Sequence, residues 1–198
     1  MTRFIDIHTH NFTNRHIELH AVGVHPWEAE NITLSQVCDT MFSDAEAIGE
    51  IGLDYACDVD KSKQEELFCR QAEIAERLQK PIILHCVKAF EPIMNLLLRY
   101  SSKAVVFHGF IGSKEQASQA LKRGYYLSFG HRTFCSPKTI EALRSTPLSQ
   151  LFVESDECDT PIEDIYAKIA DLRGVDIEEL KEATSNNYNR IFGLQDNE

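Results

Sequence analysis

Short apolar runs alternate along the chain with longer segments in which apolar residues recur at helical spacing. The runs are too short for helices, but they have the length and composition of buried strands. Seven such runs are present, at 3–7, 17–24, 46–51, 81–85, 104–108, 125–129 and 150–153. Because parallel strands are joined by helical crossovers, this alternation predicts an α/β fold with about seven parallel strands.

The segments between the runs carry residues that begin and end helices. An apolar stripe predicts a helix over 62–79, and a capping box of Thr33 with Gln36 predicts another over 34–43. Further helices are predicted to begin near Phe90, Ser113, Ser136, Thr160 and Asp176. Both an open sheet and a barrel fit this order of elements, and no glycine-rich nucleotide-binding motif supports the open sheet.

Polar residues gather where the apolar runs end. In "FIDIHTHNF", Asp6, His8 and His10 are two residues apart, so on an extended chain they lie on the same face. Six of the seven runs end in His, Glu or Asp. After the first run, the second is followed by His25, the third contains Glu50, the fourth and fifth end in His85 and His108, and the last is followed by Glu154-Ser155-Asp156. In a (β/α) barrel this end of the strands carries the active site.

Several histidines and carboxylates that converge on one point are costly without a cation, because the carboxylates repel one another and the imidazole nitrogens lack partners. Imidazole and carboxylate together suit transition-metal ions. Four histidines and two carboxylates would give six ligands, which exceeds the number that one catalytic zinc ion takes from a protein. We therefore predict two divalent ions, Zn²⁺, Mn²⁺ or Mg²⁺, that share a bridging carboxylate.

Length and composition limit the remaining possibilities. The 198 residues, 43% of them apolar, suffice for a single domain over 1–198. We expect a soluble, cytoplasmic protein, because no long apolar segment or signal peptide is apparent and the six cysteines form no regular frame. The net charge of −11 argues against a wide nucleic-acid surface, so an anionic substrate must be held locally.

The motifs "FIDIHTH", "GVHPW", "AIGEIGLDY", "PIILHCVKAF", "VVFHGFIGS", "LFVESD" and "NNYNRIFGL" resemble those of the TatD-type metal-dependent hydrolases, and they occur in the same order. That family belongs to the amidohydrolase-like TIM-barrel superfamily, and its members are commonly described as deoxyribonucleases. The resemblance implies that one ion is held by His8, His10, Glu50 and Asp156. It implies that Glu50 bridges to a second ion, held also by His85 and His108.

Three departures from the family pattern qualify this resemblance. His10 and His25 are only fifteen positions apart, where the family has a much longer segment, so we expect a distorted or incomplete (β/α) TIM-type barrel. Val87 stands where family members tend to carry arginine. The loop after Asp156 is short, which reduces the substrate-facing surface.

In the mechanism that we expect, a metal-activated water attacks the scissile bond and Asp156 acts as the general base. Lys88 and Arg132 are candidates for anion contacts, and His25 either contacts substrate or fixes the turn before Pro26. The ring of Trp27 can stack on a base, but we expect it to pack against the protein. Asp54 is either a partner of a ligand or a turn residue, and we expect His131 to lie exposed in a loop.

The leading prediction is a phosphodiesterase, a deoxyribonuclease that acts on DNA ends. A first alternative is a hydrolase of small amides, lactones or phosphoesters, which the acidic surface and short loops favour. A second alternative, of another class, is an inactive metal-binding scaffold. The sequence does not indicate the oligomeric state.

Overall fold

The fold is that of a computed structural model, which describes residues 2–193. Residues 1 and 194–198 of the predicted 1–198 domain, and with them the last residue of the closing motif, lie outside the described residues. The described residues form two compact units. Unit 1 consists of residues 2–19 and 108–193, and unit 2 consists of residues 20–107. The prediction that the chain is one domain stays a prediction.

Unit 2 is built on four parallel strands in the order β3 (Ala21–Val22), β4 (Ala47–Asp54), β5 (Ile82–Val87) and β6 (Val105–Phe107). Strands β4 and β5 are the long central pair, and their apolar side chains are completely buried in β4 and in the first half of β5. Burial on both faces explains why these segments read as continuous apolar runs.

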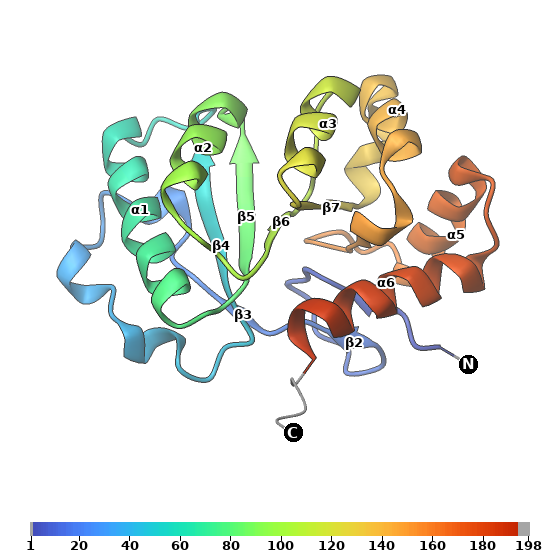
Figure 1. Ribbon diagram of the computed structural model, residues 1–198, viewed down its shortest axis with the longest axis horizontal. Helices are drawn as coiled ribbons and strands as arrows, with labels where there is room; N and C mark the ends of the chain where they lie inside the picture. The colour runs from blue at the N-terminus through green and yellow to red at the C-terminus, as the bar shows by residue number, and fades with distance from the viewer. Residues whose placement is uncertain (1, 194–198) are drawn as a thin grey trace. The chain divides into compact units, whose positions relative to one another are not determined.

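Two helices of unit 2 lie beside these central strands (Figure 1). Helix α1 (Lys61–Arg77) packs on β4, and α2 (Phe90–Leu96) packs on β5. Helix α1 confirms the helix predicted over 62–79, and it begins where the Asp60 side chain accepts a hydrogen bond from the amide of Lys63. The short 3₁₀ turns of this unit are η1 (Pro26–Glu28), η2 (Leu34–Gln36), η3 (Asp39–Phe42) and η4 (Leu97–Arg99).

In unit 1, β1 (Ile5–Asp6) pairs in parallel with β2 (Ile17–Glu18), and β7 (Tyr126–Phe129) pairs in parallel with β8 (Leu151–Val153). The helices of this unit are α3 (Lys114–Lys122), α4 (Pro137–Ser145), α5 (Ile162–Arg173) and α6 (Ile177–Phe192), with 3₁₀ turns η5 (His131–Cys135) and η6 (Leu148–Gln150). Each of these α-helices begins within two residues of a start that the sequence predicts.

Two predictions about elements were wrong. The segment 34–43 is not a helix: the capping box of Thr33 and Gln36 forms, but it opens only the 3₁₀ turn η2, and the backbone at Cys38 is extended. Residues with low helix propensity in this segment explain the failure. The run 17–24 is not one strand, because its first part pairs with β1 whereas its second part pairs with β4.

Parallel strands that alternate with helices confirm the predicted α/β class. The pairing also places Glu50 within β4 and His85 within β5, so these two side chains start from neighbouring strands. Within residues 2–193, no helix is long and apolar enough to span a lipid bilayer.

Candidate metal centre and neighbouring pocket

In unit 1, a first group of possible ligands forms where β1 and β8 end. The amide of His10 donates to the carbonyl of Asp156, and the amide of Asp156 donates to the carbonyl of His8, at 3.1 and 3.0 Å. This backbone pairing places the Nε2 atoms of His8 and His10 each 3.7 Å from the same carboxylate oxygen of Asp156. The alternation seen in "DIHTH" therefore does put both imidazoles on one side of the chain, as predicted.

His108 and Glu154 extend this group, which we call the unit 1 cluster (His8, His10, His108, Glu154 and Asp156). The rings of His8 and His108 have centroids 4.3 Å apart, and His108 Nδ1 lies 3.6 Å from Glu154 Oε1. Burial alone would raise the pKa of Glu154, but the hydrogen bond from His108 and the positive potential of His108 and His8 outweigh it and hold that pKa below its usual value.

Sequence reasoning noted Glu154 at a strand end but gave it no role. The signal was present, because Glu154 and Asp156 are two residues apart, as are His8 and His10. Gly130 leaves the room that Glu154 needs: a Cβ there would lie only 3.1 Å from Glu154 Cγ.

Asp6 begins the D-x-H-x-H row but faces another partner. Its two carboxylate oxygens accept hydrogen bonds from the amide and the hydroxyl of Ser155, at 3.0 and 2.6 Å. Burial raises the pKa of Asp6 to about 7, although the bonds from Ser155 lower it. Since Ser155 stands between Glu154 and Asp156, Asp6 fixes the segment that carries both.

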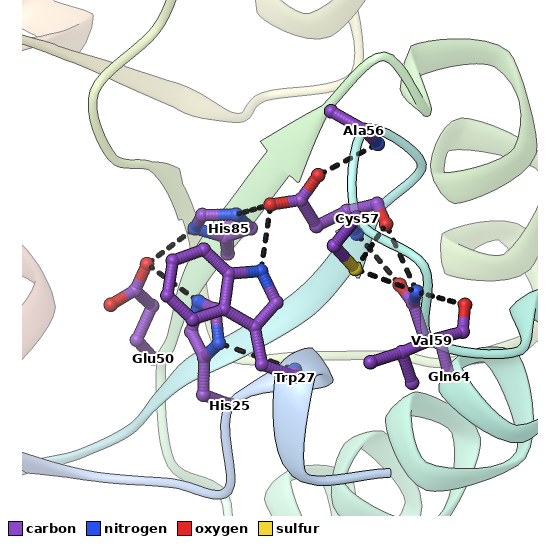
Figure 2. Close-up of polar contacts among 9 residues, drawn as sticks. His25, Trp27, Glu50, Ala56, Cys57, Val59, Gln64 and His85 are labelled. Atoms are coloured by element: carbon purple, nitrogen blue, oxygen red, sulfur yellow. Dashed lines mark hydrogen bonds and ion pairs between the residues drawn. The ribbon is translucent and has the colours of Figure 1, made fainter. Parts of the chain in front are cut away.

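In unit 2, His25, Glu50 and His85 form a second group, the unit 2 cluster (Figure 2). Glu50 Oε1 lies 2.5 Å from His85 Nδ1 and 3.6 Å from His25 Nε2, and the two imidazole rings have centroids 4.5 Å apart. His25 also caps the turn η1, because its Nδ1 accepts from the amide of Trp27 at 3.3 Å. His25 therefore does fix this turn, whereas its contact with substrate stays a prediction.

Asp54 lies behind this cluster and joins it to Trp27. Its Oδ2 accepts from Trp27 Nε1 at 2.9 Å and lies 3.4 Å from His85 Nε2, while its Oδ1 accepts from the amide of Ala56 at 2.8 Å. Burial would raise the pKa of Asp54, but the hydrogen bonds that Trp27, Ala56 and His85 give it hold that pKa low. Asp54 is thus both a turn residue and a partner of His85.

Trp27 is exposed, whereas the sequence analysis predicted that it packs against the protein. Its side chain is 55% exposed. The expectation that Trp27 packs against the protein is therefore wrong for much of the residue, although its indole nitrogen donates to the buried carboxylate of Asp54.

A pocket of about 260 Å³ opens beside Asp156 in unit 1. Its wall includes His131 and Arg132, which are both exposed, as well as Glu154 and Asp156. His131 is thus exposed, as predicted, but it also lines the pocket. Lys88, the other predicted anion contact, is exposed directly after β5, three residues beyond His85.

The donors in both clusters fit a divalent ion. In each of the groups His8–His10–Asp156, His108–Glu154–Asp156 and His25–Glu50–His85, one ligand atom per residue lies within 4.8 Å of the others. Neutral imidazole nitrogens and carboxylate oxygens are ligands that zinc and manganese accept. The assignment of Glu50 as a bridging ligand and of His108 to the second ion stays a prediction from the resemblance.

Comparison with known proteins agrees with this chemistry. The family model described as TatD related DNase matches residues 6–193. The uncharacterized metal-dependent hydrolase YabD of Bacillus subtilis is 32% identical over 197 residues, which cover 88% of this chain and 77% of YabD. The human deoxyribonuclease TATDN3 is 28% identical over 162 residues, or 74% of this chain and 59% of that protein. The chain spans 55% of the mouse TATDN3 protein.

Solved structures give the same result. The structure of YjjV, a TatD homologue from Escherichia coli, superposes with a TM-score of 0.79 at 27% identity, over 89% of this chain and 77% of YjjV. A TatD family hydrolase from Entamoeba histolytica shares the fold, with a TM-score of 0.78 at 20% identity over 89% of this chain and 75% of that chain. These likenesses agree with the predicted barrel class. Because the family model covers nearly every described residue, the chain belongs to the TatD-related DNase family.

Proposed function

We propose that the protein is a divalent-metal-dependent hydrolase that cleaves phosphodiester bonds at DNA ends, with Asp156 as the general base and Glu50 as a second essential carboxylate. The observation that carries this proposal is the unit 1 cluster, in which His8, His10 and Asp156 converge beside a pocket. The names of the relatives, which include metal-dependent hydrolases and a deoxyribonuclease, support the class of reaction.

When bound, divalent ions lower the pKa of water and polarise the scissile phosphoryl group. The proposed ligands that would hold them are His8, His10, Glu50, His85, His108 and Asp156. Asp156 also faces the pocket and is partly exposed, with 26% of its side chain accessible. This exposure and position support the proposed role of Asp156 as the acceptor of a proton from an attacking water.

The reaction that we propose forms a bond between the water oxygen and phosphorus and breaks the bond from phosphorus to the leaving oxygen. Asp156 accepts the water proton and returns it to that leaving oxygen. Arg132, Lys88 and His25 are the proposed substrate contacts. Arg132 fits this role because it brings positive charge to a pocket wall that also carries Glu154, Asp156 and Glu157.

Hydrolysis assays with Zn²⁺, Mn²⁺ or Mg²⁺ test the proposal on single-stranded DNA oligonucleotides, beside generic phosphodiester, ester and lactone substrates. We expect DNA cleavage that EDTA abolishes. In Asp156→Asn, kcat should fall by about 10²- to 10⁴-fold, the usual contribution of a general base. Glu50→Gln, which alters a proposed metal ligand, should also lower kcat. His16→Ala is the matched control, because His16 contacts Glu163 and belongs to neither cluster.

The pocket volume and the net charge favour one second candidate, a hydrolase of small amides, lactones or phosphoesters. A pocket of about 260 Å³ is slightly smaller than the usual range for small-molecule sites, so it suits a small substrate. Turnover of ester or lactone substrates without DNA cleavage would replace the nuclease proposal by this one. Metal binding without turnover of any substrate would indicate a metal-binding scaffold instead.

A further inference from the structure

Trp27, the single tryptophan of the chain, presents its ring to solvent in unit 2. It lies in the turn η1, two residues after His25 of the unit 2 cluster. Isolated exposed apolar side chains are common and need no explanation. Trp27 differs from such a side chain because polar contacts fix it beside the cluster.

The position of the indole is set by three contacts (Figure 2). The Trp27 amide donates to His25 Nδ1 at 3.3 Å, and the indole Nε1 donates to Asp54 Oδ2 at 2.9 Å. The ring meets His25 edge to face, with centroids 4.6 Å apart. Asp54 is 4% exposed and is itself held by the amide of Ala56, so the anchor is rigid. An exposed ring that is already fixed loses little entropy when a ligand covers it.

The charge of the protein makes such a ring useful. The chain carries a net charge of −11, which disfavours binding nucleic acid through its phosphates over a wide surface. A nucleobase is neutral, and stacking on an aromatic ring does not depend on positive charge. Stacking therefore gives an acidic protein a source of affinity that its own electrostatic potential does not oppose.

We infer that Trp27 is a stacking platform for a nucleobase, which it holds beside the unit 2 cluster. The inference rests on the proposed function for the identity of the reacting bond. It predicts that the protein distinguishes DNA with bases from DNA of the same length and charge that lacks them.

The fluorescence of Trp27 tests the stacking contact directly, because no other tryptophan contributes to the signal. Asp156→Asn with Zn²⁺ is titrated with an oligothymidylate and, separately, with an abasic oligonucleotide of the same length. Only the base-bearing strand should quench the emission, with a saturable curve. If it does not quench, or if the abasic strand quenches equally, the inference is overturned.

A matched pair of variants separates stacking from the support that Trp27 gives to Asp54. Trp27→Phe and Trp27→Leu both lose the hydrogen bond to Asp54, but only Phe keeps an aromatic ring. We expect KM for the oligothymidylate to be about 5- to 150-fold higher in Trp27→Leu than in Trp27→Phe, the range that corresponds to about 1–3 kcal/mol per stacked base. KM for the abasic strand should be equal in the two variants.

Equal KM values for the oligothymidylate in the two variants would reduce Trp27 to a structural role and overturn the inference. Urea unfolding of both variants verifies that they are folded to the same extent. If no DNA is hydrolysed at all, the proposed function fails, and the fluorescence titration still decides whether a base stacks on Trp27. The two failures are thus distinguishable.

Discussion

The contact between Asp6 and Ser155 offers a test of how the unit 1 cluster is held. Asp6→Ala removes the acceptor of the Ser155 amide and of the Ser155 hydroxyl, in a region where both residues are buried. The hydroxyl keeps a second partner, Thr9 Oγ1 at 2.9 Å, whereas the amide has no other hydrogen bond among the contacts that the described residues make.

The magnitude follows from these two bonds. A buried amide left without an acceptor costs about 1–3 kcal/mol, and a lost bond to a hydroxyl costs about 1 kcal/mol. We therefore expect Asp6→Ala to lower the free energy of unfolding by about 2–4 kcal/mol. Ser155→Ala leaves the amide bond intact and should cost only about 1–2 kcal/mol. In a double-mutant cycle, Asp6 and Ser155 should be coupled by about 1 kcal/mol.

Urea unfolding in the presence of EDTA measures these free energies, and calorimetric titration with Zn²⁺ measures the consequence for the cluster. Since Asp6 supports the segment that carries Asp156, Zn²⁺ affinity should fall by about 10- to 100-fold. Asp171→Ala, which removes an exposed carboxylate from α5 in the same unit, is the control. A loss of less than about 1 kcal/mol together with unaltered Zn²⁺ affinity would refute the reasoning.

Three further predictions concern packing and metal binding. Gly52→Ala should lower the free energy of unfolding in urea by about 3 kcal/mol or more, because φ is +150° and a Cβ would lie 1.9 Å from the carbonyl oxygen of His85. The control Gly124→Ala should lower it less, because a Cβ there meets no atom within 4 Å. Equal losses of free energy in the two variants would contradict this account. Tyr166→Phe should lower the free energy of unfolding by about 1–3 kcal/mol, because the buried hydroxyl of Tyr166 donates to the carbonyl of Ile5 at 2.8 Å. An unchanged midpoint of urea unfolding would argue against this prediction. Removal of metal by EDTA should lower the melting temperature, because an ion at 100 times its Kd adds about 2.7 kcal/mol to the free energy of unfolding. A melting temperature that does not respond to Zn²⁺ would speak against metal binding.

The sequence by itself determined the strand–helix order and the residue types at the strand ends. These features are readable because they are local: alternation puts His8 and His10 on one side of an extended chain, and the same rule applies to Glu154 and Asp156. The capping box at Thr33 marks the limit of local signals. It forms as predicted, yet only a 3₁₀ turn follows it, because the residues beyond it do not favour a helix.

The tertiary structure decided which partner each polar side chain meets. Asp6 looks like a member of the ligand row, but Ser155, 149 positions away, takes its carboxylate. His25 pairs with Glu50 across 25 positions, and Trp27 stays exposed while its indole nitrogen donates to the buried carboxylate of Asp54. Such contacts depend on which strands become neighbours and in what register. Side-chain spacing along one strand carries no information about the register of another, so only the folded chain could assign these partners.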